Sequence, residues 1–241
     1  MAARAETRGG PDFALEQSLL AATPADLFAT TPLQVIGIDE AGRGPWAGPV
    51  VAGAAWINPD HLKALPAGID DSKRLTPGRR QELLAGLTSL AENPEILRFA
   101  TASVSAAAID ERGILPATFD AMEAAAIEIA ATSDSLALIV DGHLAPPFAD
   151  LARRQTITVM PVVKGDQRAL SIAIAALAAK EARDAEMRQL DKAFPGYGWA
   201  SNMGYGTRDH ADALAKQGPT PQHRLSFRPV ARAAEAHGYT R

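Results

Sequence analysis

The sequence predicts an α/β fold, in which the strands of one sheet alternate along the chain with helices that cover it. Short apolar runs suited to strands alternate with longer segments that carry helix caps or are rich in alanine. The run 136–140 is apolar throughout and ends at an acidic residue, as expected of a strand covered on both faces. Hydrophobic residues make up 47% of the chain and aromatic residues only 5%, so aliphatic side chains and alanine must fill the core.

Five segments have the composition of strands. The first two, Val35–Asp39 and Val50–Ile57, are joined by a loop rich in glycine and proline, which favours a hairpin-like connection. The other three follow in the order Leu97–Val104, Leu136–Val140 and Thr156–Val163.

Helical segments separate and follow these strands. Thr76 and Pro77 form an N-cap and first-turn pair, which predicts a helix through Leu90. The longest helical segment, 170–193, is closed by a Pro-Gly pair. Further helices are expected at Ser105–Glu111, Pro116–Ala131, Asp209–Gln217 and Pro229–His237.

We expect one domain over residues 33–241, preceded by a flexible N-terminal tail over residues 1–32. Within that tail, Phe13–Phe28 has the pattern of a short amphipathic helix broken at Pro24. The chain contains no cysteine, which excludes disulfides and thiolate zinc sites. No apolar run approaches the roughly 18 residues that span a membrane. We therefore expect a cytoplasmic monomer with no membrane partner.

The net charge of −4 does not by itself favour a nucleic-acid partner, because phosphate binding needs Lys and Arg. The distribution is less even, since residues 201–241 hold six Lys or Arg against three Asp or Glu. Two interpretations stay open for this basic end: a face that binds nucleic acid weakly, or ordinary solvated helix faces.

Acidic residues end two of the strands and follow a third. Asp39 and Glu40 follow the first apolar run, Asp141 ends the fourth, and Asp166 comes shortly after the fifth. Ligands of open α/β sheets gather beyond the carboxyl ends of strands, so these side chains can converge. Four carboxylates could hold two Mg²⁺ or Mn²⁺ ions about 3.5–4 Å apart, the arrangement used for displacement at phosphorus.

The adjacency of Asp39 and Glu40 poses a geometric difficulty, because neighbouring strand residues point to opposite faces. Either the strand ends at Asp39 and the next residues turn Glu40 inward, or a bulge does so. The alternatives without chemistry are a capping or turn pair at this position and, for Asp166, a helix N-cap.

The run Asp39–Gly44 resembles the Asp-Glu-Ala-Gly-Arg-Gly signature of type 2 ribonuclease H, the ribonuclease HII family. Similar matches recur in the family's order from Leu33 to Val230, nearly the whole chain. They are Asp71-Ser72-Lys73, Val140-Asp141-Gly142, Lys164-Gly165-Asp166, Ala179-Lys180 with Arg183-Asp184, Gly204-Tyr205-Gly206-Thr207 with His210, and His223-Arg224 with Ser226-Phe227.

The resemblance implies a ribonuclease H-like fold: a mixed five-stranded sheet flanked by helices, with a helical C-terminal extension. It also implies that Asp39, Glu40, Asp141 and Asp166 are the catalytic metal-binding carboxylates. By the same resemblance, the loop of Gly42, Arg43 and Gly44 contacts the sugar and phosphates of a ribonucleotide. Tyr205 would stack on the neighbouring sugar, although alone it could be an ordinary loop tyrosine.

Other residues are candidates for phosphate contacts, which position a duplex without reading its bases. Ser72 could equally be a turn residue. For Asp184 we expect a supporting role, either in charge pairing or in a phosphate contact through Lys180. His210 and His223 are separated in sequence and lack the spacing of zinc ligands, so we do not expect a histidine metal site. The phosphate-contact candidates are Ser72, Lys73, Lys164, Lys180, His223 and Arg224.

Three positions depart from the family pattern. Ala173 and Ala176 stand where serines are usual, and Met203 stands where a lysine commonly precedes the Gly-Tyr-Gly turn. These changes could weaken substrate contacts, but they remove no carboxylate.

The resulting hypothesis is a metal-dependent endonuclease that cuts 5′ to ribonucleotides, in RNA–DNA hybrids and at single ribonucleotides in duplex DNA. By resemblance it leaves 3′-hydroxyl and 5′-phosphate ends and belongs to ribonucleotide excision repair. One rival is a resolvase or exonuclease that uses the same acids on all-DNA substrates. A second is a hybrid-binding module without catalysis, which a missing carboxylate would have indicated.

Overall fold

The structure is a computed structural model that describes residues 10–22, 31–130 and 133–241. Its centre is a mixed five-stranded sheet with the strand order β3-β2-β1-β4-β5. β1 pairs antiparallel with β2, which pairs antiparallel with β3, whereas β4 and β5 run parallel to β1. The predicted five-stranded mixed sheet is therefore confirmed. The strands are β1 Gln34–Ala41, β2 Val50–Ile57, β3 Leu97–Val104, β4 Ser135–Asp141 and β5 Thr156–Val162.

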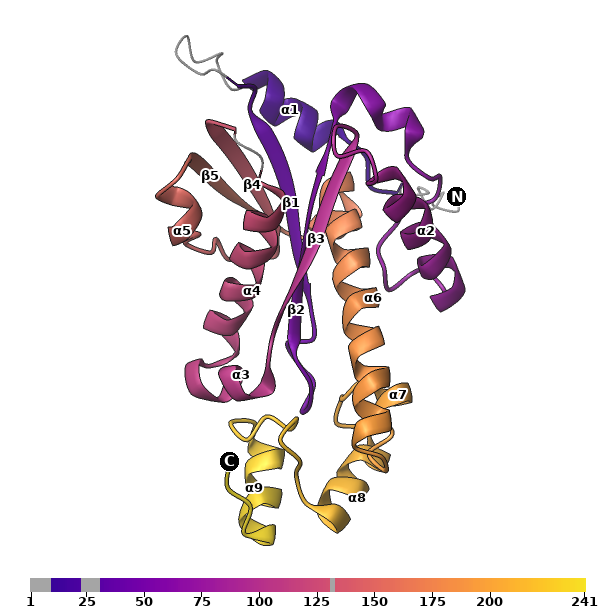
Figure 1. The fold of residues 1–241 in the computed structure, drawn as a ribbon, viewed down its shortest axis with the longest axis vertical. Helices are drawn as coiled ribbons and strands as arrows, with labels where there is room; N and C mark the ends of the chain where they lie inside the picture. The colour runs from indigo at the N-terminus through magenta and orange to yellow at the C-terminus, as the bar shows by residue number, and fades with distance from the viewer. Residues whose placement is uncertain (1–9, 23–30, 131–132) are drawn as a thin grey trace, which may run out of the picture.

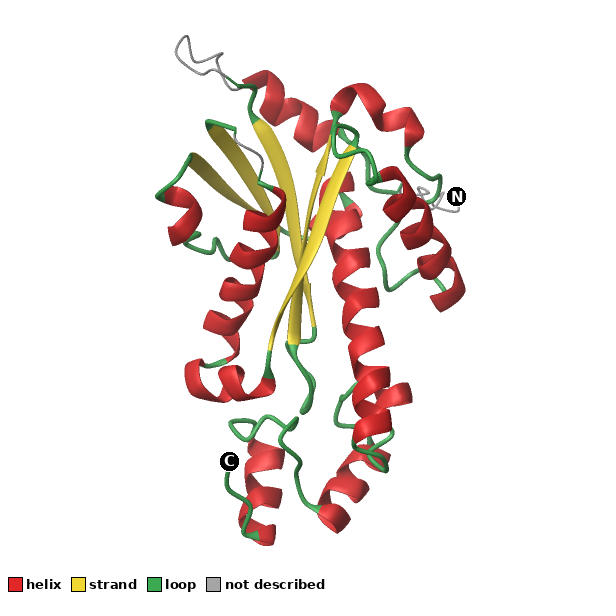
Figure 2. Cartoon of the chain, viewed as in Figure 1, coloured by secondary structure: helices red, strands yellow, loops and turns green. Residues whose placement is uncertain are grey.

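Two long helices cover opposite faces of the sheet, α4 (Ile114–Ile129) on one and α6 (Leu170–Ala193) on the other (Figure 1). The α4 side buries isoleucine, leucine and alanine from β1, β2 and β4 against alanines and Met122 of the helix. The α6 side packs Ala173, Ile174 and Leu177 against β2 and β3. Figure 2 shows the resulting layers, with helices on both sides of the strands.

Close packing of α6 on the sheet depends on two glycines. A Cβ atom at Gly37 would lie 2.3 Å from the backbone nitrogen of Ile172, and one at Gly53 would lie 2.2 Å from the carbonyl oxygen of Ala175. These distances are far below van der Waals contact, so any side chain at either position would push the helix away. Small residues on both elements thus fix the depth at which α6 rests on β1 and β2.

The expectation of a flexible N-terminal tail is wrong for residues 10–22, and a helix lies within the segment Phe13–Phe28 that was expected to form one. Residues 14–22 form α1 (Ala14–Ala22), and Phe13 packs into the core beside α6. Glu16 is fully buried, and its carboxylate accepts hydrogen bonds from the backbone N–H and hydroxyl of Ser171 at 2.8 and 2.7 Å. That carboxylate caps the first turn of α6, which ties the segment to the domain. Residues 1–9 and 23–30, including Pro24, lie outside the described residues.

The C-terminal extension consists of α7 (Trp199–Asn202), α8 (Arg208–Gln217) and α9 (Arg228–His237), gathered beyond the end of α6 (Figure 1). It confirms the helical extension that was expected. Four of the remaining helices lie between strands in the sequence: the 3₁₀ helix η1 (Pro59–Ala64), α2 (Pro77–Leu90), α3 (Ala106–Arg112) and α5 (Ala149–Ala152). The 3₁₀ helix η2 (Gly165–Gln167) lies between β5 and α6. Within the described part of the chain, no helix is long and apolar enough to cross a membrane.

Candidate active site

The four predicted carboxylates gather at one end of the sheet. β1 and β4 are parallel neighbours with Ile38 opposite Val140, which places the next residues, Asp39 and Asp141, side by side. Asp166 lies in η2, the turn between β5 and α6, and is buried. The backbone N–H of Gly165 donates to the Asp141 carboxylate at 2.6 Å, which holds this turn against the end of β4.

The carboxylates are close enough to perturb one another. Burial, followed by the charges of Glu40 and Asp141, raises the pKa of Asp39 well above its ordinary value. Burial and then the charges of Asp71 and Asp141 raise the pKa of Asp166 to about 6. The pKa of Glu40 is also raised, mainly by burial, although the neighbouring Arg43 opposes that rise. The site therefore concentrates negative charge that favours a cation.

Asp39 and Glu40 line the same hollow, although β1 shows neither the strand end at Asp39 nor the bulge that was expected. β1 continues through Ala41, and residues 36–41 pair in unbroken register with residues 56–51 of β2, so the strand neither ends at Asp39 nor bulges. On its other edge, β1 pairs with β4 only as far as Ile38. Beyond Ile38 this edge is not paired with β4 and lies beside the carboxylates. Side chains from either face of the strand can turn toward this unpaired edge.

The donor chemistry of this site fits a hard divalent cation, because it offers carboxylate oxygens. Among residues 10–22, 31–130 and 133–241, however, no three or more acidic or histidine side chains are arranged to hold a metal ion as they stand. Three of the carboxylates have other partners: Asp39 accepts from the backbone N–H of Glu40 at 2.7 Å, Glu40 accepts from Arg43 at 3.2 Å, and Asp141 accepts from the backbone N–H of Gly165. Binding an ion would thus require modest rotation of these side chains.

The raised pKa of Lys73 is a further sign of the negative charge at this site. Burial alone would lower the pKa of its ammonium group, but the carboxylates of Asp166, Asp39, Asp71 and Asp141 outweigh burial and raise it. The carboxylates that would bind a cation therefore also attract the Lys73 ammonium group.

A hollow of about 440 Å³ adjoins the carboxylates. Its lining brings together nine of the predicted site residues, and the exposed Tyr205 ring lies against Gly44 at its rim. Arg183 and Ala176 from α6 complete the wall. The lining consists of Asp39, Glu40, Ala41, Gly42, Arg43, Gly44, Ser72, Lys73, Ala176, Lys180, Arg183 and Tyr205.

His223 and Arg224 are not placed to contact phosphate, which corrects that expectation, because both are fully buried. The Arg224 guanidinium donates to the backbone carbonyls of Gly42, Arg43, Gly48 and Pro49 at 2.6–3.0 Å. Arg224 therefore holds the glycine-rich loop in shape from beneath. Lys164 is exposed in a left-handed conformation and lies outside the lining of the hollow.

Two functional residues escaped the sequence argument. Asp71 is a buried acid beside the four predicted carboxylates, and it accepts from the backbone N–H of Lys73 at 2.9 Å and from the Gln167 amide at 3.2 Å. Its sequence signal was the Asp-Asp pair before Ser72. Arg183, next to Asp184 on α6, donates to the carbonyls of Pro49, Ala47 and Met203. Nothing in the sequence indicated that this arginine binds backbone rather than phosphate.

The expected charge pairing of Asp184 is confirmed. Its carboxylate lies 2.7 Å from the Lys180 ammonium and 3.6 Å from the Arg80 guanidinium. The three departures from the family pattern occupy different surroundings. Ala173 lies in the core, Ala176 lines the hollow, and Met203 ends α7 in a left-handed conformation just before Gly204.

Solved structures share this architecture. Ribonuclease H2 from Pyrococcus horikoshii OT3 is 26% identical with a TM-score of 0.68, and the match covers 86% of this chain and 100% of that one. Bst-RNase HIII in complex with Mn²⁺ is 23% identical with a TM-score of 0.58, and that match covers 85% and 70% of the two chains. The fold and the carboxylate cluster thus define a nuclease of the ribonuclease H-like class.

The family follows from the sequence relatives. The ribonuclease HII of Ruegeria sp. (strain TM1040) is 46% identical over 200 residues, which is 82% of this chain and 79% of that protein. The ribonuclease HII of Roseiflexus castenholzii is 45% identical over 209 residues, 84% and 85% of the two chains. The profile of the ribonuclease HII family matches residues 36–230. The chain belongs to the ribonuclease HII family.

Proposed function

We propose that this nuclease hydrolyses RNA strands in RNA–DNA hybrids and cuts duplex DNA on the 5′ side of single embedded ribonucleotides. One arrangement carries the proposal: mutually repelling carboxylates adjoin a hollow lined by Gly42, Arg43, Gly44 and Tyr205. The carboxylates supply sites for cations, and the loop and tyrosine supply contacts suited to a sugar and its phosphates. The products would carry 3′-hydroxyl and 5′-phosphate ends.

Asp39, Glu40, Asp141 and Asp166 would hold two Mg²⁺ or Mn²⁺ ions. Once bound, such ions would activate water and stabilise the leaving oxygen. The structural relative Bst-RNase HIII was solved with Mn²⁺, which supports the use of a divalent cation. The carboxylate side chains fix the line of attack, because they project from the ends of rigid strands and from the turn that Asp141 holds.

Recognition of the ribonucleotide would rest on the other wall of the hollow. The 2′-hydroxyl is the group that separates RNA from DNA at one position, and the exposed backbone at Gly44 can approach it closely, whereas Gly42 is buried with its carbonyl bound by Arg224. Arg43, half-exposed and paired with Glu40, can exchange that partner for a phosphate. The Tyr205 ring offers a flat apolar face to the adjoining deoxyribose. Ser72, Lys73, Lys164 and Lys180 remain candidates for phosphate contacts.

The Asp141→Asn variant tests the assignment of the carboxylates. Cleavage of a hybrid should fall by at least about a hundredfold, because a metal-site ligand and its charge are lost. Duplex affinity measured in EDTA should change little. Asp60→Asn is the matched control, since Asp60 is exposed in η1 at the opposite end of the sheet. Full activity in Asp141→Asn would contradict the metal-ligand role.

A further inference from the structure

Two fully buried histidines lie in contact beneath the Tyr205 turn, although they are thirteen positions apart in the sequence. His210 comes from the first turn of α8, and His223 comes from the segment between α8 and α9. Their Nε2 atoms are 3.1 Å apart. The two rings thus meet although the residues are separated in sequence, and neither has a role in the carboxylate site.

The partners of each ring fix its protonation state. The Thr220 N–H can only donate, and it lies 3.0 Å from His223 Nδ1, so that nitrogen is unprotonated and the proton sits on Nε2. The Tyr205 carbonyl can only accept, and it lies 2.9 Å from His210 Nδ1, so that nitrogen carries the proton. His223 Nε2–H then donates to the free Nε2 of His210.

A second proton on either ring would meet a donor. On His223 it would face the Thr220 N–H, and on His210 it would face both His223 and the Trp199 indole N–H at 3.2 Å. Burial lowers the pKa of both rings, with that of His223 reaching about 3 under the added influence of His210 and Arg241. Geometry and electrostatics agree that both histidines stay neutral.

The pair connects the two walls of the substrate hollow. On one side, His210 holds the carbonyl of Tyr205. On the other, His223 precedes Arg224, whose guanidinium binds the carbonyls of Gly42 and Arg43. Two backbone hydrogen bonds join the same segments: the Trp46 N–H donates to the Gly204 carbonyl, and the Arg224 N–H donates to the Trp46 carbonyl, both at 2.8 Å.

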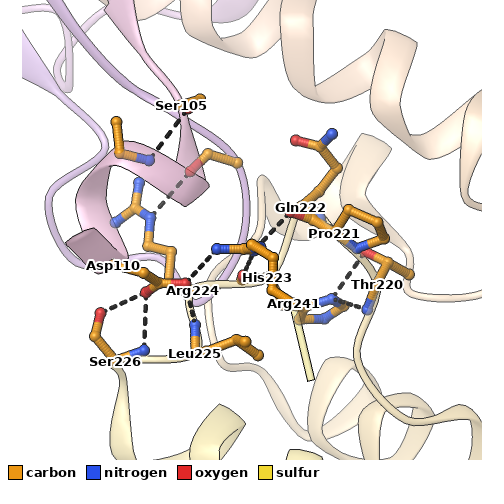
Figure 3. A network of polar contacts seen from close by, with 12 residues as sticks. Ser105, Asp110, Thr220, Pro221, Gln222, His223, Arg224, Leu225, Ser226 and Arg241 are labelled. Atoms are coloured by element: carbon orange, nitrogen blue, oxygen red, sulfur yellow. Dashed lines mark hydrogen bonds and ion pairs between the residues drawn. The ribbon is translucent and has the colours of Figure 1, made fainter. Parts of the chain in front are cut away.

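Asp110 and Arg241 hold the segment that carries His223 in place, as Figure 3 shows. Asp110 on α3 accepts from the backbone of Leu225 and Ser226 at 2.8 Å and pairs with Arg241. Arg241 also donates to the carbonyls of Pro221 and His223. Because that side is fixed, the imidazole contact transmits the position of this segment to the Tyr205 turn.

We propose that the His210–His223 pair is a positioning element that sets the Tyr205 ring against the Gly42–Gly44 loop and thereby sets the preference for a ribonucleotide. The proposal rests on the proposed function, because it concerns how that site distinguishes a ribonucleotide from DNA. Neither ring touches the substrate. His210 acts through the Tyr205 turn, and His223 acts through His210 and through Arg224, which holds the Gly42–Gly44 loop.

Two substitutions at one position separate this role from a merely structural one. In His223→Asn the side-chain oxygen can replace Nδ1 and keep the Thr220 contact, but the link to His210 is lost. In His223→Gln the amide nitrogen can replace Nε2 and keep the donor to His210, while the Thr220 contact is lost. Affinity is measured in EDTA by fluorescence anisotropy, for a DNA duplex with one ribonucleotide and for the same duplex in DNA alone.

The wild-type protein should prefer the ribonucleotide duplex, His223→Asn should lose at least threefold of that preference, and His223→Gln should keep most of it. In a Tyr205→Ala background, His223→Asn should cause no further loss. Equal losses in both variants, in step with their thermal stabilities, would overturn the role of the pair. Absence of any wild-type preference would also overturn the role of the pair, whereas failure of the wild-type protein to cut the ribonucleotide duplex in Mg²⁺ or Mn²⁺ would overturn the proposed function. If the variants fail to fold, ¹⁵N NMR of the wild-type imidazoles decides: protonated rings or the opposite tautomers would overturn the arrangement.

Discussion

Asp166→Asn should stabilise the protein in the absence of metal while it impairs catalysis. Burial and the charges of Asp71 and Asp141 raise the pKa of Asp166 from 3.8 to about 6. The folded protein therefore binds the proton more tightly than the unfolded chain, and stability falls as pH rises through this window. The full cost of ionisation, above pH 6, is about 3 kcal/mol for this rise in the pKa of Asp166. At pH 4.5, where Asp166 is mostly protonated in the folded protein, the destabilisation is only about 1 kcal/mol.

Urea denaturation in EDTA at pH 7.5 and pH 4.5 measures this effect. The free energy of unfolding gained by Asp166→Asn should be about 2 kcal/mol larger at pH 7.5 than at pH 4.5. Comparing the gain at two pH values removes any pH-independent effect of the amide, including its altered contact with Asp71. Asp60→Asn, in exposed η1, should show little such difference. A gain that is independent of pH, or larger at pH 4.5, would refute the electrostatic account.

Three further substitutions probe other parts of the structure. Arg224→Lys keeps the charge, but a lysine cannot donate to four carbonyls. The free energy of unfolding, measured by urea denaturation, should fall by about 1–3 kcal/mol, and hybrid cleavage should slow. Unchanged values would contradict the role of Arg224 beneath the loop. Gly53→Ala should cost about 1–3 kcal/mol through its clash with α6, whereas Gly78→Ala, with open space around it, should not. Lys73→Met removes the competing ammonium and should tighten Mn²⁺ binding, measured by calorimetry, by about fivefold, or about 1 kcal/mol; weaker binding would oppose that interpretation.

The local pattern of the sequence predicted most of the elements. Strands 50–57 and 97–104 and the helices 77–90 and 170–193 begin and end where apolar runs, caps and Pro-Gly breaks indicated. These signals are local, because hydrogen-bonding side chains and helix breakers act within a few residues. The short helices η1, α5 and α7 carry too few residues to show a period, and they were missed.

The candidate site was predictable as a set of carboxylates, because each lies at the end of an apolar run or shortly after one. The roles of buried polar groups were not, because they depend on tertiary contacts. The sequence predicted a phosphate contact for Arg224, yet its guanidinium binds carbonyls of a loop about 180 positions away. Glu16 reads as part of a tail, yet it caps α6. The continuous register of β1 likewise shows that Asp39 and Glu40 line one hollow without a bulge in the strand.

The central claim is that this site cuts at ribonucleotides with the help of divalent cations. The most direct measurement is cleavage of an end-labelled DNA duplex that contains one ribonucleotide, with Mg²⁺, Mn²⁺ or EDTA, beside the same duplex in DNA alone. A metal-dependent cut on the 5′ side of the ribonucleotide, with the all-DNA duplex intact, is the predicted result. Cleavage of the all-DNA duplex, or binding of the ribonucleotide duplex without any cut in either metal, would contradict the claim.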